Sequence, residues 1–299
     1  MFNALPIWIE RGHVSDVPVP STAPADVRVG DVAQGIQGIV QGLLDLLFPP
    51  RCVVCRRSGS ILCRTCLASV RAPAEPLCLR CGAPLPLNQS HSHISHALCV
   101  SCLDGRGPTA LDGLRVAAVY EGTIRKAIHA LKYENKRRAA QPLGALLAAA
   151  YHRSASVGMR ADLIIPVPLH ADRVRERGYN QAGLLARAVA ARLGLPLNDK
   201  LVIRQRATQT QVGLPWRARR ANVTGAFALT DPQAAEHLAG RRILLIDDVA
   251  TTGSTLDATA QALATAGPAS IWGLALARPA LRPTSGVHYP SREIGDQQE

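Results

Sequence analysis

The amino-acid sequence predicts an α/β fold in which helices flank a parallel sheet, preceded by a small cysteine-rich module. From residue 110 onward, short apolar runs alternate with segments of helical periodicity, a pattern typical of βα units joined by right-handed crossovers. All eight cysteines lie upstream, between residues 52 and 102. With 299 residues, of which 47% are hydrophobic, the chain can bury one substantial core and one small additional module.

Residues 1–48 are expected to form a poorly ordered N-terminus followed by an amphipathic helix. Residues 1–30 contain four prolines and no clear periodicity. Apolar residues recur at helical spacing over 36–48, and Pro49 and Pro50 stop this run. We expect the helix to dock on the protein itself. A helix for a membrane surface or a partner is the alternative, but its polar face has no Lys or Arg, which disfavours the membrane.

Four Cys-x-x-Cys pairs indicate two structural zinc sites in a module over residues 49–106. Two pairs complete a tetrahedral site of four thiolates, which leaves no open position for catalysis. Redox pairs or disulfides are the alternative, and the absence of a secretory pattern disfavours them. We expect sequential pairing, with a cross-braced arrangement as the alternative, and a solvated loop at His91, His93 and His96 rather than substitute ligands. Sequential pairing assigns one Zn²⁺ to Cys52, Cys55, Cys63 and Cys66, and the other to Cys78, Cys81, Cys99 and Cys102.

The rest of the chain divides into a domain over residues 110–280 and a tail over 281–299. The run 243–246 is wholly apolar, as expected of the central strand of a parallel sheet. The expected strands cover 114–120, 163–167, 201–203, 243–246 and 271–276, and the expected helices cover 123–132, 141–151, 180–193 and 254–266.

The residues after the central strand combine two adjacent carboxylates with a turn rich in hydroxyls and glycine. Open α/β sheets bind ligands at the C-terminal ends of their strands, and the free amides of a helix N-terminus favour an anion. The carboxylates can accept hydrogen bonds from the vicinal hydroxyls of a ribose. We therefore expect a sugar-phosphate site, with an ordinary capped helix as the alternative; a Walker-type lysine is absent. The predicted binding residues are Asp247, Asp248, Thr251, Thr252, Gly253, Ser254 and Thr255.

A second loop follows the expected strand at 163–167. Prolines fix the loop at the end of the strand, and alternate arginines suit a pyrophosphate, although a solvated basic turn is the alternative. Lys132 is a further candidate to reach this site, against the alternative of a surface lysine on a core helix. The predicted pyrophosphate loop and its cover consist of Pro166, Val167, Pro168, Arg173, Arg175 and Arg177.

Positive charge is concentrated between residues 171 and 222. The chain has a net charge of +12, and this stretch holds 11 basic and 3 acidic residues, or +8 of that total. This positive charge exceeds what one pyrophosphate needs. Amide side chains and Trp216 are interleaved with the basic residues, and this combination suits the backbone and bases of single-stranded nucleic acid. The predicted contacts are Arg204, Arg206, Arg217, Arg219 and Arg220.

The string from 243 to 255 resembles the phosphoribosyl pyrophosphate (PRPP) signature of type I phosphoribosyltransferases. With the cysteine pairs and the Arg-Gly-Tyr-Asn-Gln segment at 177–181, the chain resembles the ComF family of competence-associated proteins. The resemblance implies a type I phosphoribosyltransferase-like sheet, a double zinc ribbon, PRPP held with Mg²⁺, and handling of incoming single-stranded DNA with a competence helicase and the uptake channel as partners. The sequence shows no membrane span or signal peptide, so we expect a cytoplasmic protein.

The alternative function is an active phosphoribosyltransferase that transfers ribose 5-phosphate from PRPP to an unidentified base or amine. Purine-salvage enzymes usually carry an acid at the start of the phosphate loop, where this chain has Thr251. No general acid or base replaces it recognisably, so the sequence assigns no catalytic residue.

Overall fold

A computed structural model describes residues 49–85, 98–207 and 216–280. The chain separates into two compact units, Met1–Pro49 and Pro50–Glu299, and nearly all described residues belong to the second. The expected helix at 36–48, the three histidines before Cys99 and the tail at 281–299 lie outside the described residues.

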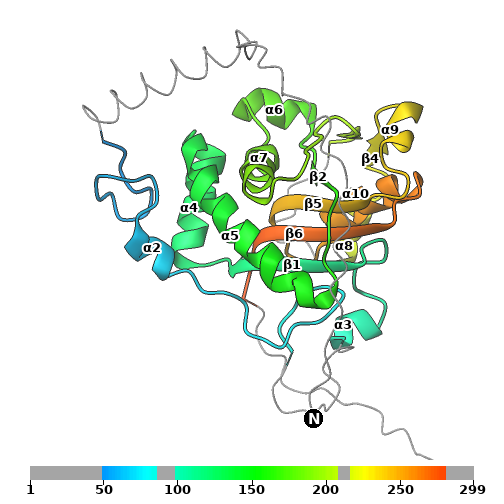
Figure 1. Ribbon diagram of the computed structural model, residues 1–299, viewed down its shortest axis with the longest axis horizontal. Coiled ribbons are helices and arrows are strands. Elements are labelled where there is room, and N and C mark those ends of the chain that lie inside the picture. Colours follow the sequence, from blue (N-terminus) through cyan, green and yellow to red (C-terminus); the bar gives the residue numbers. More distant parts are fainter. Residues whose placement is uncertain (1–48, 86–97, 208–215, 281–299) are drawn as a thin grey trace, which may run out of the picture. The chain divides into compact units, whose positions relative to one another are not determined.

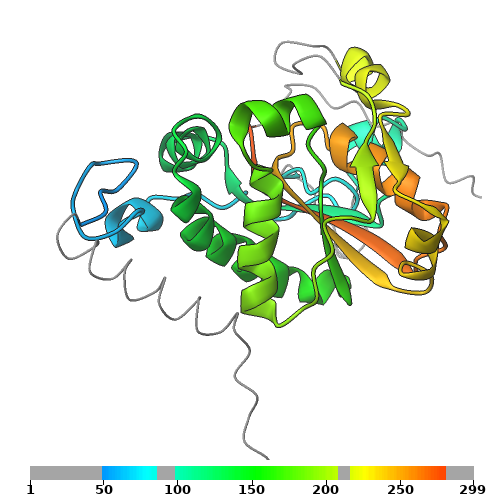
Figure 2. The same ribbon diagram turned by 90° about the horizontal axis from the view of Figure 1, so that it is seen from above.

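A parallel sheet forms the centre of the second unit (Figure 1). Its strands are β1 (Gly113–Val119), β2 (Leu163–Pro166), β5 (Arg242–Val249) and β6 (Ser270–Arg278), in the order β1-β6-β5-β2. Figure 2 shows α4 (Gly122–Tyr133), α5 (Ala140–Arg153) and α7 (Gln181–Leu193) on one side of the sheet, and α10 (Ser254–Ala264) on the other. The sheet and the helix positions confirm the predicted α/β class.

Burial on both faces explains the apolar run in the central strand. Leu244 and Ile246 belong to the hydrophobic cluster that contains residues of α4, α5 and α7. Ile243 and Leu245 belong to the cluster on the α10 side. Because successive strand side chains point to opposite faces, a strand covered on both sides must be apolar at every position.

Two features differ from the sequence prediction. The expected strand at 201–203 is β3 (Val202–Arg204), but it pairs antiparallel with β4 (Phe227–Leu229) in a separate two-stranded sheet. Six shorter elements of the domain were not anticipated: the 3-10 helices η2 (Arg137–Ala139) and η3 (Ser154–Val157), the helices α6 (Ala171–Arg177), α8 (Trp216–Val223) and α9 (Pro232–Glu236), and β4 itself. Helix α6 buries no residue, so it lacks the apolar periodicity by which a helix is recognised in sequence.

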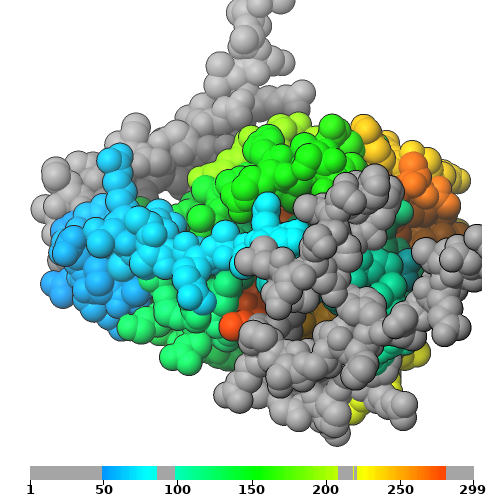
Figure 3. All heavy atoms as spheres, turned by 90° about the horizontal axis from the view of Figure 1, so that it is seen from below, coloured from blue at the N-terminus to red at the C-terminus, as the bar shows by residue number. Residues whose placement is uncertain are grey.

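The cysteine-rich module covers the outer edge of β1. Its described helices are α2 (Arg64–Ala68) and α3 (Val100–Leu103). The carbonyl oxygens of Arg71 and Arg80 accept hydrogen bonds from Val119 N–H (2.8 Å) and Leu114 N–H (2.9 Å). The segment that connects the two cysteine groups, residues 71–80, lies on the surface of the molecule (cyan in Figure 3). It therefore satisfies groups that an edge strand would otherwise expose.

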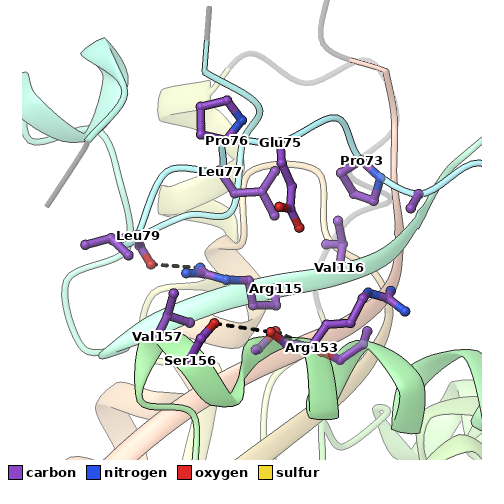
Figure 4. A pocket seen from close by; sticks show the side chains of 13 residues that line it. Pro73, Glu75, Pro76, Leu77, Leu79, Arg115, Val116, Arg153, Ser156 and Val157 are labelled. Atoms are coloured by element: carbon purple, nitrogen blue, oxygen red, sulfur yellow. Dashed lines mark hydrogen bonds between the residues drawn. The ribbon is translucent and has the colours of Figure 1, made fainter. Parts of the chain in front are cut away.

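A pocket of about 600 Å³ lies between this connecting segment, β1 and the C-terminal end of α5 (Figure 4). Arg115 forms part of its lining, and this buried guanidinium donates to the carbonyl oxygens of Leu79 (2.9 Å) and Leu114 (2.8 Å). The same group lies 5.5 Å from the ring centre of Trp272. Arg115 thus joins the module to the sheet, and the pocket includes none of the residues predicted for the sugar-phosphate site.

Candidate functional site

The acidic pair lies inside strand β5 rather than in the loop after it. Strand β5 continues to Val249, because Asp247 pairs with Ala275 and Val249 with Ala277 of β6. Asp247 is 8% exposed and Asp248 is 5% exposed. Burial, together with the neighbouring Asp248 charge, raises the pKa of Asp247 to about 8. The two carboxylates therefore stand at the C-terminal end of the strand in an environment with little water.

Lys132 supplies the positive charge for this pair. It lies in the last turn of α4, and its Nζ is 2.5 Å from Asp248 Oδ2. Apart from this ion pair, Asp248 Oδ2 has no hydrogen-bond partner among the described residues. Burial alone would lower the pKa of Lys132, but the neighbouring acids, Asp248 above all, together outweigh it, and the pKa is raised overall. Lys132 thus lies beside the acidic pair.

The turn after β5 begins helix α10 in a geometry suited to an anion. Thr252 Oγ1 lies 2.7 Å from Ser254 Oγ and accepts a hydrogen bond from Ser254 N–H (3.3 Å). Gly253 has φ +80°, and an added Cβ would lie 2.8 Å from Leu114 Cδ2. The backbone conformation therefore favours glycine, and an added Cβ would also displace the Leu114 side chain of β1. The hydroxyls of Thr252 and Ser254 thus lie together at the start of α10, and a helix N-terminus of this kind favours an anion.

Asp257 fixes the start of α10, a role that the sequence analysis did not anticipate. Its Oδ1 accepts hydrogen bonds from Thr109 N–H (2.7 Å) and Ala110 N–H (2.8 Å). An acid in the first turn of a helix is a visible signal, because it complements the helix dipole. The sequence gives no indication, however, that its partners lie nearly 150 residues away.

The proline loop lies beside the acidic pair. Pro166 pairs with Ile246, the residue before Asp247, and Val167 N–H donates to Ile246 O (2.9 Å). Asn180 Nδ2 donates to Val167 O (2.9 Å), while Asn180 Oδ1 caps α7 by accepting from Ala182 N–H (3.0 Å). The structure therefore brings the predicted pyrophosphate loop and the predicted ribose residues to neighbouring strand ends.

The three predicted cover arginines belong to α6 but have different surroundings. Arg173 pairs with Glu176 (2.6 Å) and Arg175 pairs with Asp172, both on the exposed surface of the helix. Arg177 is partly buried, donates to Gln181 Oε1 (3.2 Å) and stacks 5.0 Å from the ring centre of Tyr133. Arg177 therefore links the end of α6 to α7 and to the end of α4.

Tyr179 strengthens this junction, and the sequence analysis assigned it no role. Its hydroxyl donates to Leu131 O, next to Lys132, and the Arg137 guanidinium stacks 4.5 Å from its ring centre. Burial raises the pKa of Tyr179, so the hydroxyl stays protonated as a donor. The loop that follows α6 thus contacts the end of α4 next to Lys132.

The residues predicted for nucleic acid do not share one environment. Arg204, at the end of β3, is partly buried and lies 5.5 Å from the ring centre of Phe227. Burial lowers the pKa of Arg204, and the Asp247 carboxylate acts in the opposite direction, which places Arg204 within electrostatic reach of the acidic pair. Arg206 donates to the carbonyl oxygens of Asn222 (3.1 Å) and Thr224 (2.9 Å). The side chains of Arg217, Arg219 and Arg220 lie outside the described part of the structure.

The cysteines form two groups, as sequential pairing predicts. In each group all four sulfur atoms lie within 4.8 Å of one another. Two cross-pair contacts, Cys55–Cys63 at 3.7 Å and Cys81–Cys99 at 3.6 Å, are far longer than a disulfide bond. The members are Cys52, Cys55, Cys63 and Cys66 in one group, and Cys78, Cys81, Cys99 and Cys102 in the other.

The local backbone of both groups suits a thiolate-bound zinc ion. Cys63 N–H points to Cys52 Sγ (3.5 Å), and Cys99 N–H points to Cys78 Sγ (3.3 Å). Arg56 and Gly82 follow the second cysteine of a pair, and both have positive φ values, of 64° and 66°. The turn directs amides toward sulfur, and four thiolates complete the tetrahedral set that structural zinc prefers.

Comparison with known proteins identifies the two parts of the chain. A family model described as a double zinc ribbon domain matches residues 43–104, and one described as a phosphoribosyl transferase domain matches residues 180–282. DNA utilization protein YhgH of Escherichia coli K12 is 33% identical over 232 residues, which are 76% of this chain and 96% of that protein. Competence protein F of Haemophilus influenzae is 32% identical over 238 residues, which are 77% and 98% of the two chains. The chain belongs to the ComF family.

Competence protein ComFC of Bacillus subtilis is a more distant relative, 24% identical over 213 residues, which are 70% of this chain and 80% of that protein. This ComF-family protein combines a phosphoribosyltransferase-like parallel sheet with an N-terminal double zinc ribbon. Among its described helices, none has the length and apolar character needed to span a membrane.

Proposed function

We propose that this ComF-family protein binds PRPP through β5 and the start of α10, and supports the handling of single-stranded DNA during DNA uptake in the cytoplasm. The observation that carries the PRPP proposal is the buried acidic pair next to the turn at Gly253. The carboxylates would accept hydrogen bonds from the ribose hydroxyls, and the turn and α10 would hold the 5-phosphate.

Residues around the acidic pair would bind the diphosphate group of PRPP. Val167 and its neighbouring prolines lie next to Asp247, where a diphosphate attached to the ribose would extend. Mg²⁺ bound with PRPP would neutralise part of the diphosphate charge. Lys132 and Arg204 place two further positive charges near the acids. The site therefore balances its buried carboxylates while remaining attractive to an anion.

Binding is tested by titrating PRPP with Mg²⁺ into the zinc-loaded protein by calorimetry. Asp247→Asn/Asp248→Asn should abolish the heat of binding. Each substitution replaces one accepting carboxylate oxygen by an NH2 group, which cannot accept a hydrogen bond from a ribose hydroxyl, and it removes the negative charge that faces Lys132. Asp199→Asn is the matched control, since Asp199 forms a surface pair with Arg187 (2.6 Å). Equal PRPP affinity in the wild type and the double variant would refute the proposed site.

The role in DNA handling draws on the relatives and on the basic stretch. Relatives are named as DNA utilization and competence proteins, and residues 171–222 carry a net charge of +8. A competence helicase and the uptake channel are the proposed partners. Replacing Arg217, Arg219 and Arg220 by Ala should weaken single-stranded DNA binding and flatten its salt dependence by about 0.7 for each lost phosphate contact. An unchanged affinity and slope would exclude these residues from the DNA contact.

An active phosphoribosyltransferase is the second candidate, favoured by the intact acidic pair and phosphate turn. The reaction would displace pyrophosphate from the anomeric carbon of PRPP through an oxocarbenium-like state. Incubation with PRPP and Mg²⁺ across a panel of bases and amines, monitored for pyrophosphate release, tests this function. Release that depends on both an acceptor and Asp247 would establish the enzyme. Transformation that survives Asp247→Ala/Asp248→Ala would show that the pocket is not central to DNA handling.

A further inference from the structure

Helix α4 carries a basic and aromatic outer face beside the candidate ribose site. Ile124, Ile128 and Leu131 are buried on its inner face. Arg125, Lys126, His129 and Tyr133 are exposed and spaced so that they share the opposite face. The core accounts for the inner face, whereas the exposed side chains of the outer face are not part of the core.

Tyr133 is the unusual member of this outer face. The residue is 63% exposed, which is high for a large aromatic ring. The His129 ring lies 5.0 Å from it at an angle of 50°, and the Arg177 guanidinium lies 5.0 Å from its ring centre. The ring is therefore held in place by its neighbours but remains largely open to solvent.

Positive charge surrounds Tyr133, and the nearby acids are engaged in pairs. Glu134 pairs with His129 (3.3 Å), and Glu121 pairs with Arg71 (2.6 Å). A Cβ added at Gly178, next to Arg177, would lie 3.2 Å from Arg137 Nη2, so Arg137 continues the basic surface beyond the end of the helix. We define the α4 surface as Arg125, Lys126, His129, Tyr133, Arg137 and Arg177.

We infer that the α4 surface binds single-stranded nucleic acid, with phosphates on its arginines and lysine and a base stacked on Tyr133. Exposed aromatic rings within a basic track are the elements by which proteins hold single strands without reading their sequence. A duplex keeps its bases stacked inside and would leave Tyr133 unused. An acidic protein would use the charges but does not require an open ring.

This surface is distinct from the basic residues between 204 and 220, and it needs no PRPP. It shares a helix with the candidate site, since Lys132, the residue before Tyr133, pairs with Asp248. The inference rests on the nucleic-acid part of the proposed function only. A failure of PRPP binding would therefore leave the α4 surface untouched.

The test compares the affinity of the zinc-loaded protein for two fluorescent oligomers of equal length, an oligodeoxythymidine and an abasic strand. Tyr133→Ala should weaken binding of oligodeoxythymidine about five- to 150-fold, the range for one lost stacking contact, and leave the abasic strand nearly unchanged. Tyr133→Phe keeps the ring and should retain affinity. Arg125→Ala/Lys126→Ala should weaken both oligomers and lower the salt slope by about 1.4.

Matched controls come from the other end of the sheet. Arg153→Ala/Arg241→Ala removes two exposed charges at the C-terminal end of α5 and just before β5, and should change the salt slope less than the α4 pair does. Zinc content and the midpoint of urea unfolding establish that each variant is folded. Wild-type protein that does not bind oligodeoxythymidine, or that prefers a duplex, overturns the inference. So does Tyr133→Ala protein that binds both oligomers as the wild type does, or loses both equally.

Discussion

Replacement of Lys132 by Met tests whether the ion pair with Asp248 balances the buried acids. The side chains of Lys132 and Asp248 are 19% and 6% exposed, and the charged atoms are 2.5 Å apart. Methionine keeps the length and apolar stem of lysine but removes the charge. Asp248 would then be a buried carboxylate beside Asp247 without the Lys132 ammonium.

Two considerations set the size of the effect. Removing one partner of a buried ion pair typically costs about 3–5 kcal/mol of unfolding free energy. The carboxyl can instead take up a proton, which at pH 7 costs about 4 kcal/mol for a group with an ordinary pKa near 3.9. At pH 8 protonation costs still more, about 5–6 kcal/mol, so we expect Lys132→Met to lose about 3–5 kcal/mol at that pH. The loss should shrink to about 1–2 kcal/mol at pH 5, where protonation is easier.

Urea unfolding of the zinc-loaded protein at both pH values measures this effect. Lys132→Met/Asp248→Asn should recover stability to within about 1 kcal/mol of the wild type, because no unpaired charge remains. Lys126→Met is the control on the exposed face of the same helix and should stay within about 0.5 kcal/mol. A Lys132→Met protein as stable as this control, or a double variant without recovery, would show that the pair does not balance the site.

Three further predictions follow from the same geometry. Asp247 is protonated below its pKa of about 8, so PRPP affinity measured by calorimetry should rise between pH 6.5 and about 8.5, whereas a flat profile would contradict the role of this carboxylate. The sign is opposite for stability, because an unfolded aspartate ionises near pH 4, and the contribution of Asp247 should fall as pH rises from about 4 to about 8. Gly253→Ala should lower PRPP affinity more than tenfold and the free energy of unfolding by about 1–3 kcal/mol. Gly158→Ala is the control, because Gly158 has φ +87° and open space around it, so this variant reports the cost of the backbone conformation alone. Equal losses of stability in the two variants would exclude a role for the contact with Leu114. Cys81→Ser should reduce bound zinc from about two ions to one in native mass spectrometry, and retention of both ions would contradict the role of Cys81 as a zinc ligand.

Local sequence patterns predict part of the candidate site. The central strand and the helix after it were predictable, because an apolar run followed by a hydroxyl- and glycine-rich turn is a local signal. The apolar run predicts a strand that ends before Asp247 and Asp248, but strand β5 includes both acids. Pairing with β6 continues as far as Val249 and Ala277, and this extension is set by the partner strand rather than by the residues of β5.

Contacts between distant segments were harder to predict. Asp257 is held by Thr109 and Ala110, and Tyr179 is held by Leu131, so each contact joins separate elements. Helix α6 lacked a signal for another reason, because it buries no side chain. It is bounded by the His170 cap, which accepts from Asp172 N–H (3.3 Å), and by Gly178 at φ +76°. Such boundaries are visible in sequence, but without an apolar stripe they also fit a turn.

Arg204 shows why a count of charges cannot define an interface. In sequence it belongs to one basic stretch with Arg206 and the arginines of α8. In the structure it lies beside Phe227 and within electrostatic reach of Asp247, whereas Arg206 donates to backbone carbonyls at the C-terminal end of α8. A guanidinium that counters a buried carboxylate contributes less to attracting a polyanion than an exposed one does. The excess positive charge of this chain is therefore divided: Lys132 pairs with Asp248 and Arg204 interacts electrostatically with Asp247, whereas Arg125 and Lys126 of α4 are exposed at the surface.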